Sequence, residues 1–350
     1  MTWEDNIRKV VPYVAGEQPK QKGVIKLNTN ECPYPPAPSV AKLAMEMDTN
    51  TLRLYPDPDT TPIVSALAEY YGVDTDQVFV GVGSDDVISM SFMTFFNSDK
   101  PILFPDVTYS FYDVWADLYK IPYKTVPLKE DWSLDVEGFK QPNGGVIFPN
   151  PNAPTGLLAG LDEVEEIIKA NPDVVVIVDE AYIDFGGQSA LSLIEKYENL
   201  LVVQTFSKSR AMAGLRIGFC IGNKKIIKYL NDVKFSFNSY TMNMPSQALG
   251  AAAVKDDIYF KETTAKIIAT REWTKKELTR LGFTFPDSMA NFIFASHKSV
   301  PAKDIFNYLR EQNIYVRYWN KDRINNSLRI TIGTDVEMKV LIGALEAYLG

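Results

Sequence analysis

Residues 200–222 read LLVVQTFSKSRAMAGLRIGFCIG, and this stretch decides the fold that we predict for the 350-residue chain. It contains two apolar segments, LLVVQTF and LRIGFCIG, each with the length and composition of a buried strand. Strands that are apolar throughout are typical of parallel sheets covered by helices on both faces. Ligands bind beyond the carboxyl ends of the strands in such sheets, so Lys208, which follows the first segment closely, is expected at a ligand site.

Outward from this stretch, strand-like and helical patterns alternate along the middle of the chain. The strand-like segments are short and largely apolar, and they lie at residues 78–83, 101–105, 123–127, 144–149 and 174–182. The helical segments are amphipathic, and they lie at residues 61–72, 84–96, 108–120, 160–171 and 190–198. Alternation of this kind predicts an α/β fold with a mainly parallel sheet.

The two ends of the chain show different patterns. The proline-rich segments NECPYPPAPS and LYPDP predict extended loops near the N-terminus, because proline fixes φ and lacks a backbone donor. After Asn223 a long helix is expected near residues 258–281. Shorter strand and helix patterns follow it at residues 291–296, 302–313, 315–319, 327–333 and 336–349. These signals predict a smaller α+β domain.

Composition excludes several classes of function. A net charge of −8 disfavours nonspecific binding to nucleic acids and to anionic membranes. Two cysteines far apart predict neither a disulfide framework nor a zinc site, and no apolar run has the length of a signal peptide or a membrane span. The single histidine, His297, excludes multi-histidine metal sites. We expect it at the surface, which disfavours a Ser-His-Asp triad. The expectation is a cytoplasmic protein without a metal, a membrane or a nucleic-acid partner.

Asp179 ends the apolar segment VVVIV, and Tyr182 follows three residues later. A buried carboxylate is costly unless it faces a cation or hydrogen-bond donors. The pair would suit a pyridine ring, with the carboxylate at the ring nitrogen and the phenol at a ring oxygen. A helix cap or a structural ion pair is the alternative for Asp179.

Ser207, Lys208 and Arg216 lie within ten residues of one another, with small residues between them. A poorly solvated amine after a buried strand suits a nucleophile, and the neighbouring groups suit a phosphate; a lysine at the surface is the alternative. The segment GVGSDD at residues 81–86 could add backbone N–H groups at a helix N-terminus. It matches neither the dinucleotide nor the P-loop pattern, so neither NAD nor ATP is favoured.

Order and spacing together carry a family resemblance. The chain resembles the fold-type I pyridoxal-phosphate aminotransferases and, within them, the histidinol-phosphate aminotransferase family. TFSKSRAMAGLRIGF and DEAYIDF are the most specific segments, while NTNECPYPP and LYPDP favour this family over other aminotransferases. The matching segments reach from NTNECPYPP to SLRITIG, which is nearly the whole chain.

The resemblance implies pyridoxal 5'-phosphate as the cofactor and three catalytic roles. Lys208 would form the Schiff base with the cofactor and then move the proton. Asp179 would keep the pyridine nitrogen protonated, so that the ring withdraws electrons. Tyr182 would donate a hydrogen bond to the ring hydroxyl.

Further cofactor and substrate contacts follow from the same resemblance. The remaining residues expected to bind the cofactor are Ser84 and Asp85 through backbone N–H groups, Tyr109 by stacking, Ser207 and Arg216 at the phosphate, and Tyr55 at the phosphate of a neighbouring subunit. Arg329 would bind the substrate carboxylate, Arg317 the substrate phosphate, and Asn30 would help close the site. The family usually has Asn before Pro-Thr-Gly, where this chain has Ala153; Asn152, one residue earlier, is the candidate to replace it.

The resemblance implies a fold-type I architecture in two domains. Residues 46–255 would form a large α/β domain with a mainly parallel sheet. Residues 1–45 and 256–350 would form a small α+β domain with an N-terminal arm. The arm and Tyr55 imply a homodimer with shared active sites.

The implied reaction transfers an amino group from L-histidinol phosphate to 2-oxoglutarate in histidine biosynthesis. An aromatic aminotransferase and a threonine-phosphate decarboxylase are the enzymatic alternatives, because they share the cofactor contacts. A noncatalytic pyridoxal-phosphate-binding regulator is the alternative outside the enzymes, although no basic helix-turn-helix segment is present in the sequence.

Overall fold

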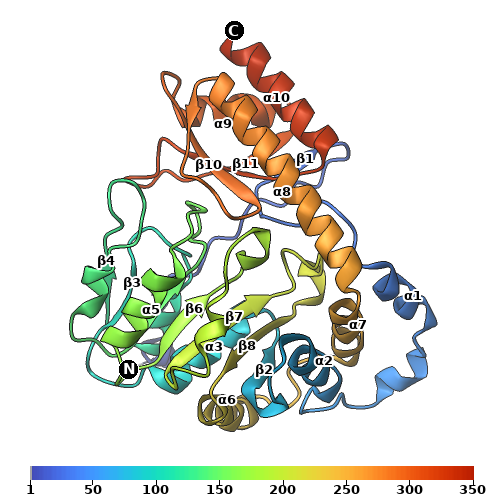
Figure 1. The fold of residues 1–350 in the computed structure, drawn as a ribbon, viewed down its shortest axis with the longest axis vertical. Helices are drawn as coiled ribbons and strands as arrows, with labels where there is room; N and C mark the ends of the chain where they lie inside the picture. The colour runs from blue at the N-terminus through green and yellow to red at the C-terminus, as the bar shows by residue number, and fades with distance from the viewer. Residues whose placement is uncertain (1) are drawn as a thin grey trace.

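The structure is a computed structural model that describes residues 2–350, and its two sheets lie one above the other in Figure 1. The lower sheet has seven strands in the order β2-β8-β7-β6-β5-β3-β4. Their bounds are β2 Val78–Gly81, β3 Ile102–Pro105, β4 Tyr123–Val126, β5 Val146–Pro149, β6 Val176–Asp179, β7 Leu200–Thr205 and β8 Gly218–Gly222. The strands β7, β6, β5, β3 and β4 are parallel, whereas β8 is antiparallel to both β7 and β2. The mainly parallel sheet of the α/β prediction is confirmed.

Both faces of the seven-stranded sheet are buried, as its apolar strands predict. Alternate residues of β6 enter different apolar clusters, with Val176 and Val178 in one and Ile177 in the other. The helices near this sheet are α2 Thr61–Tyr71, α3 Ser84–Phe95, α4 Tyr112–Tyr119, α5 Leu161–Ala170, α6 Lys224–Phe237 and α7 Met244–Lys255. As predicted, α2 ends at Gly72, whose φ of 68° suits a residue without a Cβ.

The upper sheet has five strands in the order β1-β11-β12-β10-β9. Its strands are β1 Ile25–Leu27, β9 Phe283–Thr284, β10 Phe292–His297, β11 Ile314–Tyr318 and β12 Leu328–Thr331. Its helices are α8 Asp257–Arg280, α9 Ala302–Glu311 and α10 Asp335–Leu349, and α8 runs from beside α7 up to this sheet (Figure 1). Because β1 pairs with β11, the two ends of the chain share one sheet. The domain boundaries at residues 45 and 255 stay a prediction.

Four local expectations were wrong or incomplete. The proline-rich N-terminal region contains α1 Pro38–Glu46, because proline is tolerated in the first turn of a helix. Helices α6 and α7 were not predicted. Residues 190–198 form only the short 3-10 helix η6 Ala190–Leu193, where the Glu180 carboxylate accepts the N–H of Ala190. His297 is buried in β10, and its Nε2 lies 3.0 Å from the carbonyl oxygen of Leu281.

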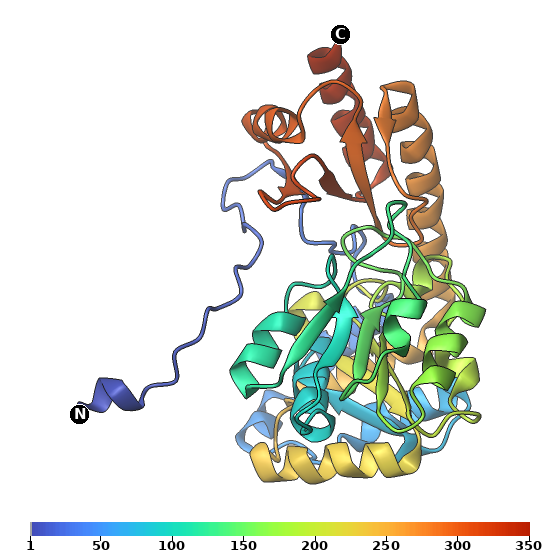
Figure 2. The ribbon, with the colours of Figure 1, turned by 90° about the vertical axis from the view of Figure 1, so that its left-hand side faces the viewer.

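The N-terminal segment extends away from the rest of the molecule (Figure 2). Its apolar side chains are largely exposed, among them Trp3, Val11 and Val14. The segment contacts the body through Arg8, whose Nη1 donates to the carbonyl oxygen of Leu118 at 2.8 Å, and through Tyr13, whose ring stacks on Phe111 at 4.2 Å between centroids. Within the described residues, no helix is both long enough and apolar enough to cross a bilayer.

Candidate active site

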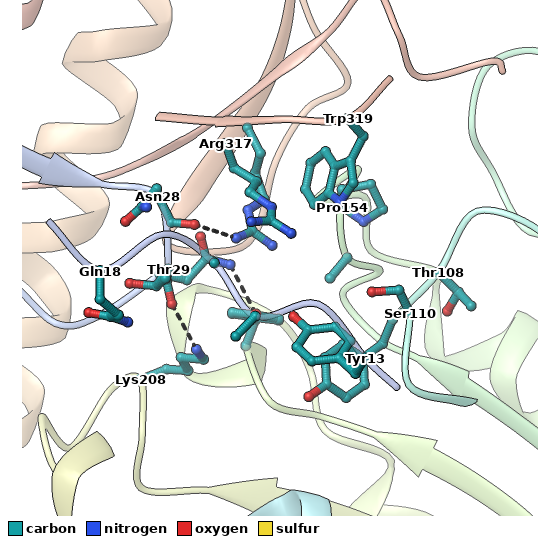
Figure 3. Close-up of a pocket in the computed structure, with 17 residues that line it drawn as sticks. Tyr13, Gln18, Asn28, Thr29, Thr108, Ser110, Pro154, Lys208, Arg317 and Trp319 are labelled. Atoms are coloured by element: carbon teal, nitrogen blue, oxygen red, sulfur yellow. Dashed lines mark hydrogen bonds between the residues drawn. The ribbon is translucent and has the colours of Figure 1, made fainter. Parts of the chain in front are cut away.

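Two adjoining cavities lie where the carboxyl ends of the parallel strands meet the five-stranded sheet. The inner cavity is lined by residues at or beyond the carboxyl ends of β2, β6 and β7, including Ser84, Asp179, Tyr182, Ser207, Lys208 and Arg216. The outer cavity is lined by the N-terminal segment and by β11 and β12, including Tyr13, Asn30, Arg317, Trp319 and Arg329 (Figure 3). Lys208, Tyr182 and Tyr109 line both cavities. Most of the predicted site residues therefore converge on one continuous space.

Lys208 lies at the junction of the two cavities. Its Nζ donates a hydrogen bond to the carbonyl oxygen of Thr29 at 3.2 Å (Figure 3). The same nitrogen lies 5.8 Å from the centre of the Tyr182 ring. Among the described residues that line the two cavities, Lys208 is the single lysine. Its amine is thus the nucleophile available there.

Asp179 is buried at the end of β6, with 5% of its surface exposed. Its carboxylate accepts hydrogen bonds from the Tyr112 hydroxyl at 2.8 Å and from the N–H of Ala181 at 3.3 Å. Burial raises the pKa of Asp179 to about 6, although the Tyr112 hydrogen bond acts in the opposite direction. A cation beside this carboxylate would favour its charged form.

Tyr182 connects the large sheet to the N-terminal part of the chain. Its hydroxyl accepts a hydrogen bond from Asn30 Nδ2 at 3.0 Å. The Oδ1 atom of Asn30 accepts the hydroxyl of Thr331 at 3.0 Å, and the carbonyl oxygen of Asn30 accepts Asn291 Nδ2. Asn30 has a φ of 56°, a conformation that Asn adopts more readily than most residues.

The N-terminus of α3 faces the inner cavity beside Arg216. The Arg216 guanidinium donates to Asp85 Oδ2 at 2.8 Å, and Tyr109 donates to the other carboxylate oxygen of Asp85 at 2.8 Å. A Cβ atom at Gly83, which precedes α3, would lie 2.5 Å from Arg216 Nη2. Ser207 is buried nearby, and its hydroxyl accepts a hydrogen bond from Thr205. Backbone donors, a hydroxyl and a guanidinium therefore surround one end of the inner cavity, which is the donor set that binds a phosphate.

Arg317 and Arg329 are directly opposite each other on the antiparallel strands β11 and β12. Each guanidinium lies 5.2 Å from the centre of the Trp319 ring. Arg329 donates to the carbonyl oxygen of Asn28 at 2.9 Å, but its Nε is buried and has no partner in the part of the chain that the structure describes. Burial lowers the pKa of Arg329, and the charge of Arg317 acts in the same direction. Two like charges and an unsatisfied donor favour a bound anion here.

Two predicted site residues lie elsewhere. Asn152 lines neither cavity, and its amide nitrogen donates to the carbonyl oxygen of Val107 and to the Thr155 hydroxyl. Its two N–H groups are thus used inside the protein, so Asn152 does not replace an amide donor at Ala153. Tyr55 is 80% exposed and stacks on Tyr240, away from both cavities.

Three residues at the site were missed in the sequence. Tyr112 binds Asp179, while Tyr13 and Trp319 line the outer cavity. Tyr112 follows Tyr109 by three residues at the start of a helical pattern, which is a weak signal for a shared location. Tyr13 lies in a loop without a motif, and only the pairing of β11 with β12 places Trp319 beside both arginines.

Comparison with known proteins points to one family. The family of class I and II aminotransferases matches residues 22–345. The chain is 52% identical to the histidinol-phosphate aminotransferase of Lactococcus lactis subsp. cremoris strain MG1363, covering 100% of this chain and 98% of that one. It is also 52% identical to the histidinol-phosphate aminotransferase of Clostridium botulinum strain Langeland, covering 99% and 98%. The crystal structure of the Sinorhizobium meliloti histidinol-phosphate aminotransferase in complex with pyridoxal-5'-phosphate superposes with a TM-score of 0.85, at 25% identity over 93% of this chain and 90% of that one.

Proposed function

The chain belongs to the class I and II aminotransferase family, and we propose that it transfers an amino group between L-histidinol phosphate and 2-oxoglutarate in histidine biosynthesis. The products are imidazole acetol phosphate and L-glutamate. One observation carries the proposal from the site itself: Lys208 lies between a buried carboxylate, Asp179, and a pair of arginines, Arg317 and Arg329. This arrangement supplies a nucleophile, a partner for a cationic ring and a binding site for substrate anions.

Pyridoxal 5'-phosphate is the cofactor of this enzyme, and the inner cavity fits it. When bound, this cofactor supplies a carbonyl group that binds amines and a ring that withdraws electrons. The N-terminus of α3, Ser207 and Arg216 would hold its phosphate, and the space that a Cβ at Gly83 would fill is part of this cradle. Asp179 would keep the ring nitrogen protonated, because a buried carboxylate is stabilised by a cation.

Lys208 has two roles in the proposed mechanism. Its amine would hold the cofactor covalently, and a substrate amine would displace it. The freed Nζ would then accept the proton from the substrate carbon that bears the amino group and give it back later in the transfer. Tyr182 and Tyr109 orient the ring in this mechanism, the first through its hydroxyl and the second by stacking. Asn30 positions the Tyr182 hydroxyl through its hydrogen bond.

The two arginines explain how one site accepts two different anions. L-Histidinol phosphate carries a phosphate and no carboxylate, whereas glutamate carries carboxylates. A guanidinium binds either anion through two parallel hydrogen bonds. We assign the phosphate to Arg317 and the substrate carboxylate to Arg329, whose buried Nε has no partner among residues 2–350.

The active enzyme is proposed to be a homodimer whose sites are shared between subunits. Tyr55, Leu52 and Leu54 are exposed on one surface segment, and the exposed ring of Tyr240 stacks on Tyr55. Exposed apolar groups of this kind mark contact surfaces between proteins. Tyr55 would reach the cofactor phosphate of the second subunit.

A substrate panel combined with peptide mapping tests the proposal. Borohydride reduction of the cofactor-loaded enzyme should place the pyridoxyl group on Lys208, and Lys208→Ala should prevent the labelling. Among histidinol phosphate, phenylalanine and threonine phosphate as amino donors, histidinol phosphate should give the highest kcat/KM. A label on another lysine would reject the role of Lys208. A preference for phenylalanine, for threonine phosphate or for histidinol without its phosphate would reject the proposed substrate.

A further inference from the structure

The loop between β11 and β12, residues 319–327, connects two strands of the five-stranded sheet and packs against the region of the seven-stranded sheet. Its Ile324 is buried in the apolar cluster on one face of the seven-stranded sheet. Phe294 of β10 lies in the same cluster and packs edge-to-face against Trp132, with 5.8 Å between the ring centres. The loop is therefore anchored outside the sheet to which its flanking strands belong.

Arg323 makes the polar part of this anchor. Its Nη1 forms an ion pair with Asp106, and its Nη2 donates to the carbonyl oxygen of Leu128 at 3.0 Å. Its guanidinium also lies 5.2 Å from the centre of the Trp132 ring. One side chain thus contacts a carboxylate, a backbone carbonyl and an aromatic face, all from segments next to the seven-stranded sheet. A guanidinium can make these three contacts at once, whereas an ammonium group cannot reproduce this geometry.

The backbone at this contact adopts an unusual conformation on both sides. Arg323 has a φ of 68° and Trp132 has a φ of 70°. Residues with a Cβ adopt such angles at a cost, and they keep them only where surrounding contacts hold them. The contact between Arg323 and Trp132 is one interaction that holds both.

Asp106 lies on the segment that carries Tyr109, a residue of the inner cavity. It follows β3 and precedes Tyr109 by three residues. Its other oxygen, Oδ1, accepts the N–H of Leu128 at 2.9 Å, and the carbonyl oxygen of the next residue, Val107, accepts Asn152 Nδ2 at 3.1 Å. These two hydrogen bonds fix the segment that carries Tyr109 to the segments that follow β4 and β5.

We propose that Arg323 is a positioning residue that sets the distance between the substrate-binding arginines and the cofactor site. Arg317 and Arg329 lie on the two strands that flank the loop, so a fixed loop end also fixes the strand ends that carry them. Asp106 fixes the opposite side through Tyr109. This inference rests on the proposed function, in which the two arginines bind the anionic groups of the substrates.

Replacing Arg323 should raise KM moderately, and only for substrates that carry an anionic group. The Arg323 side chain is 38% exposed, so the ion pair alone contributes little to stability. For Arg323→Gln we expect KM for histidinol phosphate and for glutamate to rise about three- to tenfold, with kcat within about twofold of the parent. Histidinol, which lacks both anionic groups, should show no such rise in KM.

Three variants separate positioning from folding. Asp106→Asn removes the charge but keeps an oxygen for the N–H of Leu128, and it should reproduce the KM effect of Arg323→Gln. Arg323→Lys should restore part of the affinity, because it keeps the charge and loses the planar group. Arg280→Gln is the matched control, since Arg280 pairs with Glu277 and Glu346 without contacting the seven-stranded sheet. It should leave KM unchanged.

Hydrogen exchange of the cofactor-loaded protein without substrate gives a readout other than activity. Arg323→Gln should speed exchange in residues 128–133 and 319–327, while Arg280→Gln should not. Unchanged KM values together with unchanged exchange overturn the inference, and so does an equal effect of Arg280→Gln. A parent enzyme that does not use histidinol phosphate overturns the proposed function instead. The inference is then judged by exchange and by KM for glutamate.

Discussion

At the scale of a single residue, the burial of Asp179 makes the stability of the cofactor-free protein depend on pH. Burial raises its pKa from 3.8 to about 6, so between these values the folded protein without cofactor binds more protons than the unfolded chain. The stability that the folded protein gains from binding a proton at Asp179 is fully present below pH 3.8. This stability is lost as the pH rises through about 6. A protonated ring nitrogen would offset this loss in the cofactor-loaded enzyme.

Replacing Asp179 by Asn should therefore stabilise the cofactor-free protein at neutral pH. Relative to the parent, the free energy of unfolding of Asp179→Asn should increase by about 3 kcal/mol between acidic and neutral pH, because two pKa units correspond to this energy. Urea unfolding of both proteins across this pH range measures the difference. A difference that stays constant with pH would contradict the role of burial. With cofactor bound, the variant should lose at least about 3 kcal/mol of transition-state stabilisation in kcat/KM.

The two arginines should have separate effects on the two half-reactions. We expect Arg329→Ala to weaken the glutamate half-reaction and Arg317→Ala chiefly the histidinol-phosphate half-reaction, each by about 2–4 kcal/mol in transition-state binding. Single-turnover kinetics of each half-reaction, with Arg280→Ala as a control, measures these losses. Normal use of histidinol phosphate by Arg317→Ala would remove that residue from the phosphate site.

At the scale of elements, the turn between β2 and α3 shapes the phosphate cradle. Gly83 has a φ of 87°, and an added Cβ would meet Arg216 at 2.5 Å. Gly72 ends α2 with a φ of 68°, but no atom lies within 4 Å of its added Cβ. The two glycines share a positive φ, which would be strained for a residue with a Cβ, and they differ in their neighbours.

Gly83→Ala should therefore weaken cofactor binding, whereas Gly72→Ala should not. We expect at least about a tenfold loss of affinity for Gly83→Ala, the size of one charge-assisted hydrogen bond. Both variants should lose about 1 kcal/mol of stability, because both place a Cβ at positive φ. Equilibrium binding of pyridoxal phosphate and thermal unfolding measure the two effects. Equal affinities for the two variants would contradict a phosphate site at this turn.

At the scale of the whole molecule, the surface around Tyr55 exposes aromatic side chains that nothing in the described part of a single chain covers. Tyr55 and Phe237 are 80% and 67% exposed, although large aromatic side chains are usually buried. The N-terminal segment, which extends away from the body in Figure 2, exposes further apolar groups. A second copy of the chain would cover such surfaces in the proposed homodimer.

Subunit exchange tests whether Tyr55 acts across the dimer. Mixing Lys208→Ala with Tyr55→Ala should give heterodimers in which one site has both native groups and the other has neither. Activity should then exceed that of both parents. Lys208→Ala mixed with Asp179→Asn is the control, because both residues belong to the same site and no intact site can form. Confirmed exchange without a gain in activity would place Tyr55 outside the partner's site.

The sequence by itself determined the strands and their functional ends. Apolar runs such as those of β6 and β7 predicted buried parallel strands, because burial on both faces requires apolar residues at every position. The same rule placed Asp179 and Lys208 at neighbouring strand ends, since adjacent parallel strands finish at the same edge of the sheet. The detailed roles of these residues, and the identity of the substrate, came from the family resemblance.

Only the tertiary structure decided which distant polar groups meet. Asn30 and Tyr182 are 152 residues apart, and Asn28 and Arg329 are 301 residues apart, yet each pair forms a hydrogen bond. The use of the Asn152 amide inside the protein, the burial of His297 and the contact of Arg323 with Asp106 likewise depend on how the two sheets pack. Local patterns record whether a segment is buried, because the hydrophobic effect acts on every residue of it. They do not record the partner of a polar side chain, because that partner is set by the packing of segments remote in sequence.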